Sequence, residues 1–219
     1  MDGLMPFQSD SQFCSATFGM GCFWGPEARF GALPGVVRTR VGYAGGSSLN
    51  PTYRELGNHT ETLQVEFDET ILTYEHILRT FWDNHNPYNT NGYKGRQYQS
   101  LLFYHDDSQK VAIDAELRRR SDMGLGRPDT EIIPYAGFYS AEERHQKYYV
   151  KRYPNAVATL ESLFPSRPEG WADTTIAARL NGLAKGYTNL ERLKTEIASW
   201  PLPEADRDDL LASISGIRW

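Results

Sequence analysis

The chain changes from strand-like to helix-like sequence at a single glycine, Gly21, and this junction limits the folds it can adopt. Residues 14–20, CSATFGM, are small or β-tolerant and run into Gly21, a pattern typical of a strand that enters a turn. Pro26 follows in the first helical turn, where a missing N–H costs nothing, and Gly31 and Gly35 stand near the expected helix end. A strand followed at once by a helix indicates a mixed fold built on a sheet.

Further strands and helices follow in mixed order. Strand patterns occur at GVVRTRVGYAGG (35–46), ETLQVEFDE (61–69), YQSLLFYHDD (98–107) and TEIIPY (130–135). Helical patterns occur at TYEHILRTFWDNH (73–85), from a Ser108 cap to about Arg120, and at SAEERHQKYYVKRYP (140–154). In the last of these, Ser140 and Glu143 have capping-box spacing and Pro154 ends the run. Adjacent strands between helices predict an α+β sheet with helices packed on it.

The length of 219 residues allows one main domain with an appendage. We expect an N-terminal tail over 1–13 and the main domain over 14–167. After Pro165 the composition changes, and residues 168–219 contain two helical stretches. This C-terminal helical extension is expected to pack against the main domain rather than to bind a partner.

The charge of the chain argues against two classes of partner. A net charge of −5 and a pI near 5.6 give no general attraction to nucleic acid or to anionic membranes. The first residues lack a basic and apolar signal pattern, and no stretch approaches the ~18 apolar residues of a membrane span. We therefore expect a cytoplasmic protein.

Two cysteines, Cys14 and Cys22, are the candidate reactive groups. If the segment between them is extended, they lie roughly 20 Å apart, too far for a disulfide. Cys22 falls at the start of the expected helix, where backbone N–H groups stabilise a thiolate, so its pKa is expected to fall. Cys14 lies within a strand and fits the ordinary alternative, a small apolar residue.

Glu61 is the candidate acid. It has the same parity as Leu63, Val65 and Phe67, so its carboxyl is expected to face the apolar side of the strand. Burial there raises a carboxyl pKa, which allows the group to donate a proton near neutral pH. Periodicity alone leaves open a frayed strand end with Glu61 in water.

The tyrosines, histidines and glycines of the chain are candidates for hydroxyl, metal and dinucleotide sites. Tyr53 and Tyr98 lie in or beside long loops, where most tyrosines bury a ring and expose a hydroxyl. The five histidines show no metal-ligand spacing, and no metal is expected. Gly19 and Gly21 begin like a dinucleotide-binding loop, but Trp24 occupies the third glycine position.

Several short blocks together resemble one family. They are G-C-F-W-G (21–25), G-Y-A-G-G (42–46), N-P-T-Y-R-E (50–55), H-T-E (59–61), Q-Y-x-S (97–100) and H-Q-K-Y (145–148). In order over about 14–155, they resemble the peptide methionine-(S)-sulfoxide reductases, the A-type methionine sulfoxide reductases. The resemblance implies a ferredoxin-like α/β sandwich core and no metal or organic cofactor.

The resemblance also implies a reaction and a set of site residues. The enzyme would reduce the S-epimer of free or protein-bound methionine sulfoxide, a repair reaction under oxidative stress. Attack by a cysteine thiolate with proton donation to the oxygen would yield methionine and a sulfenic acid. The residues carried over are Cys22 as nucleophile, Glu61 as acid, Tyr53 and Tyr98 as hydroxyls that bind the oxygen, and Phe23 and Trp24 as walls for the substrate methyl group.

The chain departs from the family pattern at three points. Tyr93 and Asn86 stand where common members have Asp, which affects the hydrogen-bond network expected around the oxygen. No cysteine follows Cys22, whereas many members keep resolving cysteines near the C-terminus. We therefore predict a one-cysteine cycle in a monomer, with thioredoxin, glutaredoxin or a small thiol as reductant. Cys14 is the alternative resolving residue.

Two other functions remain at this stage. A cysteine hydrolase or acyltransferase would pair Cys22 with an imidazole base, for which His59 and His145 are the candidates. A non-catalytic binder of oxidised methionine is the second alternative, because Tyr93 replaces the usual Asp.

Overall fold

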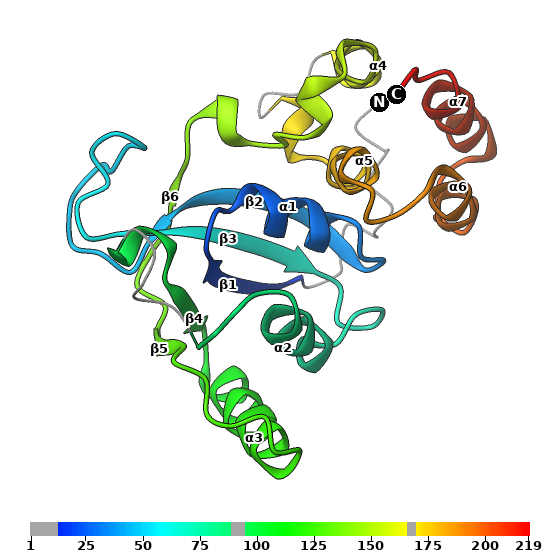
Figure 1. Ribbon diagram of the computed structural model, residues 1–219. Helices are drawn as coiled ribbons and strands as arrows, with labels where there is room; N and C mark the ends of the chain where they lie inside the picture. The colour runs from blue at the N-terminus through cyan, green and yellow to red at the C-terminus, as the bar shows by residue number, and fades with distance from the viewer. Residues whose placement is uncertain (1–12, 89–94, 166–169) are drawn as a thin grey trace.

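A computed structural model describes residues 13–88, 95–165 and 170–219 (Figure 1). The tail expected over 1–13 lies, except for Phe13, outside these residues, as does Tyr93. Within them, six strands form one mixed sheet in the order β5-β4-β1-β3-β2-β6. Their bounds are β1 Cys14–Met20, β2 Val36–Ala44, β3 Thr60–Phe67, β4 Ser100–Tyr104, β5 Glu131–Pro134 and β6 Tyr139–Ser140.

The central part of the sheet has the expected ferredoxin-like topology. Helix α1 (Trp24–Gly31) connects β1 to β2, and α2 (Tyr74–Asp83) connects β3 to β4. The sheet places β4, β1, β3 and β2 side by side and antiparallel, the spatial order of a βαββαβ unit. β5 extends one edge in parallel with β4, and β6 extends the other edge antiparallel to β2.

Both connecting helices cover the same face of the sheet. The ring of Phe18 on β1 lies 4.7 Å from that of Phe30 on α1 and 5.4 Å from that of Phe81 on α2, between centroids. Leu63 and Val65 of β3 belong to the same hydrophobic core. The alternation read from the sequence of β3 is therefore confirmed.

The cap expected at Ser108 is wrong. Helix α3 (Asp107–Asp122) is capped by Asp106, whose carboxylate accepts the Gln109 N–H at 2.8 Å. The Ser108 hydroxyl instead donates to the same carboxylate at 2.6 Å. An Asp side chain caps as well as a Ser, and here it comes first along the chain.

The helix expected over 140–154 is also wrong. Ser140 ends β6, and the segment then forms two 3-10 turns, Glu143–His145 and Val150–Arg152. Lys147 lies between them with φ +53°, a left-handed conformation that an α-helix excludes. Pro154 does not end a helix but begins α4 (Pro154–Leu163), since Pro is tolerated in a first turn.

Three further helices confirm the helical character of the C-terminal region. They are α5 (Thr175–Lys185), α6 (Leu190–Ala198) and α7 (Glu204–Ser215), and they share one hydrophobic cluster with α4. The 167/168 boundary itself stays a prediction. None of the described helices is both long and apolar enough to cross a membrane.

Helix α5 packs directly on α1 (Figure 1). A Cβ at Gly31 would lie 2.6 Å from the Ala178 carbonyl oxygen, and one at Gly182 would lie 2.8 Å from the Ala28 carbonyl oxygen. The two backbones therefore approach each other through glycines. The extension thus packs against the helix that begins beside Cys22, as expected.

Candidate active site

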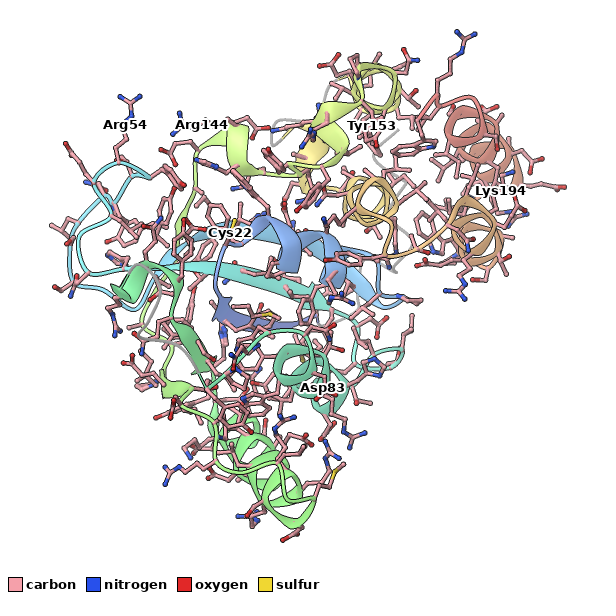
Figure 2. All side chains as sticks on the ribbon, in the orientation of Figure 1. Cys22, Arg54, Asp83, Arg144, Tyr153 and Lys194 are labelled. Atoms are coloured by element: carbon pink, nitrogen blue, oxygen red, sulfur yellow. The ribbon has the colours of Figure 1, made fainter. Side chains whose placement is uncertain are left out.

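Cys22 lies between the end of β1 and the start of α1 (Figure 2). Gly21 has φ +81°, a conformation that favours glycine, and it turns the chain out of the strand. Phe23 is the N-cap residue of α1, so the preceding Cys22 stands just outside the helix and is exposed. The junction expected from the sequence is confirmed.

The expectation that the pKa of Cys22 falls is wrong for the substrate-free protein. Although the residue is exposed, the protein groups around its sulfur partly desolvate the thiol and raise this pKa, and the negative charge of Glu61 raises it further. A hydrogen bond from the Trp24 N–H to the sulfur acts in the opposite direction but does not outweigh them. The thiol is therefore the resting form of Cys22.

The carboxyl of Glu61 lies under the start of α1. The residue is 1% exposed, which excludes the frayed strand end. One carboxyl oxygen accepts the Phe23 N–H at 3.2 Å and the other accepts the side-chain amide of Gln97 at 2.8 Å. The neighbour of Cys22 in sequence thus holds Glu61 by its backbone.

Tyr98 connects this carboxyl to the second tyrosine. It ends a 3-10 turn, Gly95–Tyr98, and its pKa is raised. Burial is the main cause, followed by the charge of Glu61, a hydrogen bond with Tyr53 and the proximity of Cys22. The structure therefore brings together Cys22, Tyr53, Glu61 and Tyr98, which come from a turn, a loop, a strand and a 3-10 turn.

Phe23 and Trp24 belong to an aromatic cluster beside the thiol. Trp24 stacks on Tyr148 with 3.8 Å between ring centroids, and Phe23 lies 6.1 Å from Tyr43. His145 packs between them, 5.5 Å from the Phe23 ring and 5.9 Å from the Trp24 ring. Burial lowers the pKa of His145, so its ring is neutral near pH 7.

Sequence reasoning missed Glu142, which supports both sides of the site. Its carboxylate accepts the Tyr43 hydroxyl at 2.7 Å and the Tyr53 N–H at 3.2 Å. Gln97 was missed as well, although it stands in the Q-Y-x-S block. That block gave a signal for Gln97, whereas no sequence pattern pointed to Glu142.

A buried ion pair fixes α1 to the rest of the fold. Lys147 and Glu27 are 1% and 0% exposed, and the Lys147 ammonium lies 2.7 Å from the Glu27 carboxylate. The same ammonium donates to the Thr39 carbonyl on β2 at 2.7 Å. The pair holds the helix through its fourth residue, one turn from the site.

The loop that carries Tyr53 is tied down at both ends by Arg96. Its guanidinium donates to the Gly45 carbonyl at 3.0 Å and to the Asn58 carbonyl at 2.9 Å. Glu131 pairs with the same guanidinium at 2.7 Å. Arg96 therefore links the Tyr53 loop to the 3-10 turn that ends in Tyr98.

The two candidate histidines do not pair with Cys22. His59 accepts the Gly46 N–H at 3.1 Å and donates to the Ser48 carbonyl at 2.8 Å, so both ring nitrogens are used within the loop. Nε2 of His145 accepts from Arg144 at 3.2 Å. In the described part of the chain, no group of three or more His, Cys, Asp or Glu residues could hold a metal ion.

Comparison with known proteins identifies the family. A family model described as peptide methionine sulfoxide reductase matches residues 14–165. The chain belongs to the peptide methionine sulfoxide reductase family. This confirms the resemblance and, with it, an oxidoreductase activity.

Two members of this family share between 41% and 45% of their aligned residues with this chain. The peptide methionine sulfoxide reductase of Drosophila melanogaster is 41% identical over 194 residues, which are 88% of this chain and 77% of that protein. MsrA of Geobacter sulfurreducens is 45% identical over 63% of this chain and 90% of its own. The Drosophila match is longer than the family model and reaches into the C-terminal region.

Solved structures of methionine sulfoxide reductases share the fold. Methionine sulfoxide reductase A of Corynebacterium diphtheriae aligns with a TM-score of 0.55 at 34% identity, over 67% of this chain and 77% of that chain. Reduced Mxr1 from Saccharomyces cerevisiae aligns with a TM-score of 0.59 at 28% identity, over 66% of this chain and 88% of that chain.

Proposed function

We propose that this reductase converts the S-epimer of methionine sulfoxide to methionine, with Cys22 as the nucleophile and Glu61 as the acid. The observation that carries the proposal is the hydrogen bond from the Phe23 N–H to Glu61, which holds a buried carboxyl next to the cysteine. Tyr98 forms a hydrogen bond with Tyr53, and burial and the charges of Glu61 and Cys22 raise its pKa. These contacts support a site in which a nucleophile, an acid and two hydroxyls act on one sulfoxide group.

The reaction transfers oxygen from one sulfur to another. The Cys22 thiolate attacks the sulfoxide sulfur while Glu61 gives a proton to the oxygen, whose departure as an unprotonated group is unfavourable. The Tyr53 and Tyr98 hydroxyls donate hydrogen bonds to the oxygen as negative charge develops on it. The attack forms a bond between the Cys22 sulfur and the substrate sulfur, and the substrate oxygen leaves as water. Water then adds to the Cys22 sulfur and gives up a proton, while the sulfur–sulfur bond breaks with its electron pair on the methionine sulfur. The products are methionine and a Cys22 sulfenic acid.

The raised pKa of Cys22 fits this division of roles. The negative charge of Glu61 is one cause of the raised pKa, so a proton on Glu61 removes that cause and favours the thiolate. Movement of one proton from Cys22 to Glu61 leaves the total number of protons unchanged. It produces the nucleophile and the acid together.

Phe23 and Trp24 form the wall of the methyl-binding pocket in this proposal. Stacking of Trp24 on Tyr148 holds the indole in one orientation. An aromatic wall favours an S-methyl group and keeps water away from the reacting atoms. Such a wall contacts methionine sulfoxide whether it is free or part of a polypeptide.

Regeneration uses an external thiol, because Cys14 lies at the wrong end of β1. Cys14 is in register with Phe67, whereas Met20 at the other end is in register with Ser100. The seven residues of β1 span roughly 20 Å at ~3.3 Å per residue. No disulfide bridges that distance in the folded protein.

Two molecules of thiol complete the cycle. The first condenses with the sulfenic acid to a mixed disulfide and releases water, and the second exchanges with it to restore Cys22. Thioredoxin, glutaredoxin or a small thiol has this chemistry, and the cytoplasm supplies all three. A monomer suffices, because a single chain contributes every residue of the proposed site.

A single-turnover assay tests the proposal. The protein and its Cys22→Ser variant are incubated with each sulfoxide epimer without reductant, and methionine is measured per enzyme. One equivalent from the S-epimer alone, absent in the variant, is the expected result. Binding of the sulfoxide without release of methionine would identify a binder and contradict the proposal.

A further inference from the structure

The aromatic cluster continues from Trp24 across the surface to the C-terminal extension. Tyr148 stacks on Trp24, and the Tyr149 ring lies 5.3 Å from that of Tyr148. The Lys185 ammonium, at the end of α5, lies 4.8 Å from the Tyr149 ring, and the Arg152 guanidinium lies 5.9 Å from the Tyr148 ring. We call Tyr148, Tyr149, Arg152 and Lys185 the basic tyrosine surface.

Both cations of this surface are exposed. In 13–88, 95–165 and 170–219, no carboxylate lies within ion-pair distance of Arg152 or Lys185. Lys151 and Lys194 differ, because they pair with Glu143 at 2.6 Å and Glu191 at 3.2 Å. The chain carries a net charge of −5, so these two cations, which have no carboxylate partner among the described residues, form a local positive region on an acidic protein.

The extension holds the basic tyrosine surface in place. The Asn181 side-chain carbonyl on α5 accepts the N–H groups of Tyr149 at 2.9 Å and Val150 at 3.1 Å. Arg179, 1% exposed, donates to the Gly31 carbonyl at the end of α1 at 2.8 Å. The surface and the helix that begins beside Cys22 are therefore fixed to the same element, which lowers the entropic cost of binding a partner.

We propose that the basic tyrosine surface binds the polypeptide that flanks the oxidised methionine and favours an acidic side chain in it. The inference rests on the proposed function and names a substrate class for it. An extended chain advances ~3.3 Å per residue, so an acidic side chain a few residues from the sulfoxide reaches Lys185. Tyrosine rings supply rigid contact area, and the cations supply charge complementarity.

The test compares three substrates with dithiothreitol as reductant. They are N-acetylmethionine sulfoxide, a peptide with Asp residues flanking the sulfoxide, and the same peptide with Lys residues. The unmodified protein is expected to show a lower KM for the Asp peptide than for the Lys peptide. The difference is expected to shrink at high salt, because exposed charges are screened.

Charge removal sharpens the test. In a Lys185→Gln, Arg152→Gln double variant, the ratio of the KM for the Asp peptide to that for N-acetylmethionine sulfoxide is expected to rise by up to about 25-fold, since each of two exposed ion pairs contributes up to about fivefold and the two factors multiply. Lys194→Gln is the matched control and leaves the ratio unchanged. Figure 2 shows Lys194 on α6, at the far side of the molecule from Cys22.

Three results would overturn the inference. Equal KM values for the two peptides would remove the acidic preference, and an unchanged ratio in the double variant would remove the surface from binding. In a parallel assay of the double variant with thioredoxin as reductant, a higher KM for thioredoxin with both peptides unaffected would assign the surface to the reductant. In each case, reduction of N-acetylmethionine sulfoxide keeps the proposed function intact. No methionine from any substrate would instead overturn the proposed function and this inference together.

Discussion

Cys14 begins strand β1 and Cys22 follows just after its other end, but the two cysteines lie in different environments. At one end, Cys14 is partly buried, and burial, a hydrogen bond with Glu69 and the charges of Glu69 and Asp106 raise its pKa to about 11. At the other end, the chain turns at Gly21 and exposes Cys22 at a helix start. The pKa of both thiols is raised, but only at Cys22 does a backbone N–H act against the rise.

The two cysteines differ in the groups around them more than in the direction of their pKa shifts. Beside Cys22, Glu61 comes from β3, Tyr98 from a 3-10 turn and Tyr53 from a loop, and these groups interact. Beside Cys14, Glu69 supplies a hydrogen bond and a negative charge, and Asp106 supplies a second negative charge. Protonation of Glu61 removes a negative charge that raises the pKa of Cys22, and so it favours the Cys22 thiolate.

Replacement of the Cys22 sulfur is expected to have the largest effect on turnover. Cys22→Ser is expected to abolish methionine formation, since an alcohol at this position does not form the nucleophile. Cys14→Ser is the matched control and is expected to retain full thioredoxin-dependent turnover. Steady-state assays of both variants measure this. Loss of thioredoxin-dependent turnover in Cys14→Ser, with the single-turnover yield intact, would make Cys14 the resolving cysteine.

Glu61→Gln is expected to give the next largest effect. An amide keeps the shape and accepts the Phe23 N–H but donates no acidic proton, so kcat is expected to fall by about 10²–10⁴. The same change removes a negative charge that raises the pKa of Cys22, so this pKa is expected to fall. Thiolate absorbance against pH measures the shift. A higher pKa in the variant would contradict the proposed coupling.

The sequence predicted the Cys22 end well because the signals there are local. The strand, the glycine turn and the helix start are read within residues 14–31, and the parity of Glu61 within β3. The raised pKa of Cys22 could not be predicted, since it depends on burial and on a carboxylate from another strand. Glu142 was missed for the same reason, because its partners lie 99 and 89 positions away.

The segment over 140–154 shows the opposite case, in which a local signal was misleading. Ser140 and Glu143 have the spacing of a helix start, but Lys147 binds Glu27, 120 positions away, through its backbone N–H and its ammonium. A tertiary contact of two buried groups outweighs a helix propensity of less than about 1 kcal/mol per residue.

The rate of alkylation at different pH values reports the thiolate fraction of Cys14 and of Cys22. The pKa of Cys14 is raised from 9.0 to about 11, so its thiolate fraction below pH 9 is about a hundredfold lower than that of an unperturbed thiol. Its reaction with iodoacetamide is expected to speed up about tenfold per pH unit until about pH 11. Mass spectrometry of the labelled sites is expected to show Cys22 modified first. Equal rates in urea provide the control, and equal rates in the folded protein would contradict the comparison.

The smallest expected effect on activity comes from Arg96→Lys, which tests whether Arg96 positions the Tyr53 loop or only stabilises the fold. Arg96 spans the Gly45 and Asn58 carbonyls at the two ends of the Tyr53 loop, and the single ammonium of Lys does not reproduce this geometry. Arg96→Lys is expected to lower kcat/KM by about fivefold, the equivalent of one net hydrogen bond of about 1 kcal/mol.

The matched change at the Cys14 end is Gln109→Ala. The Gln109 amide donates to the Ser15 carbonyl at 2.7 Å and accepts the His105 N–H at 3.0 Å, so it also holds two backbone groups. Its loss is expected to lower the free energy of unfolding by about 1–3 kcal/mol and to leave kcat/KM unchanged. Denaturant unfolding and kinetics of both variants decide the matter. Equal losses of kcat/KM at Arg96 and Gln109 would mean that overall stability, rather than the position of Tyr53, sets the rate.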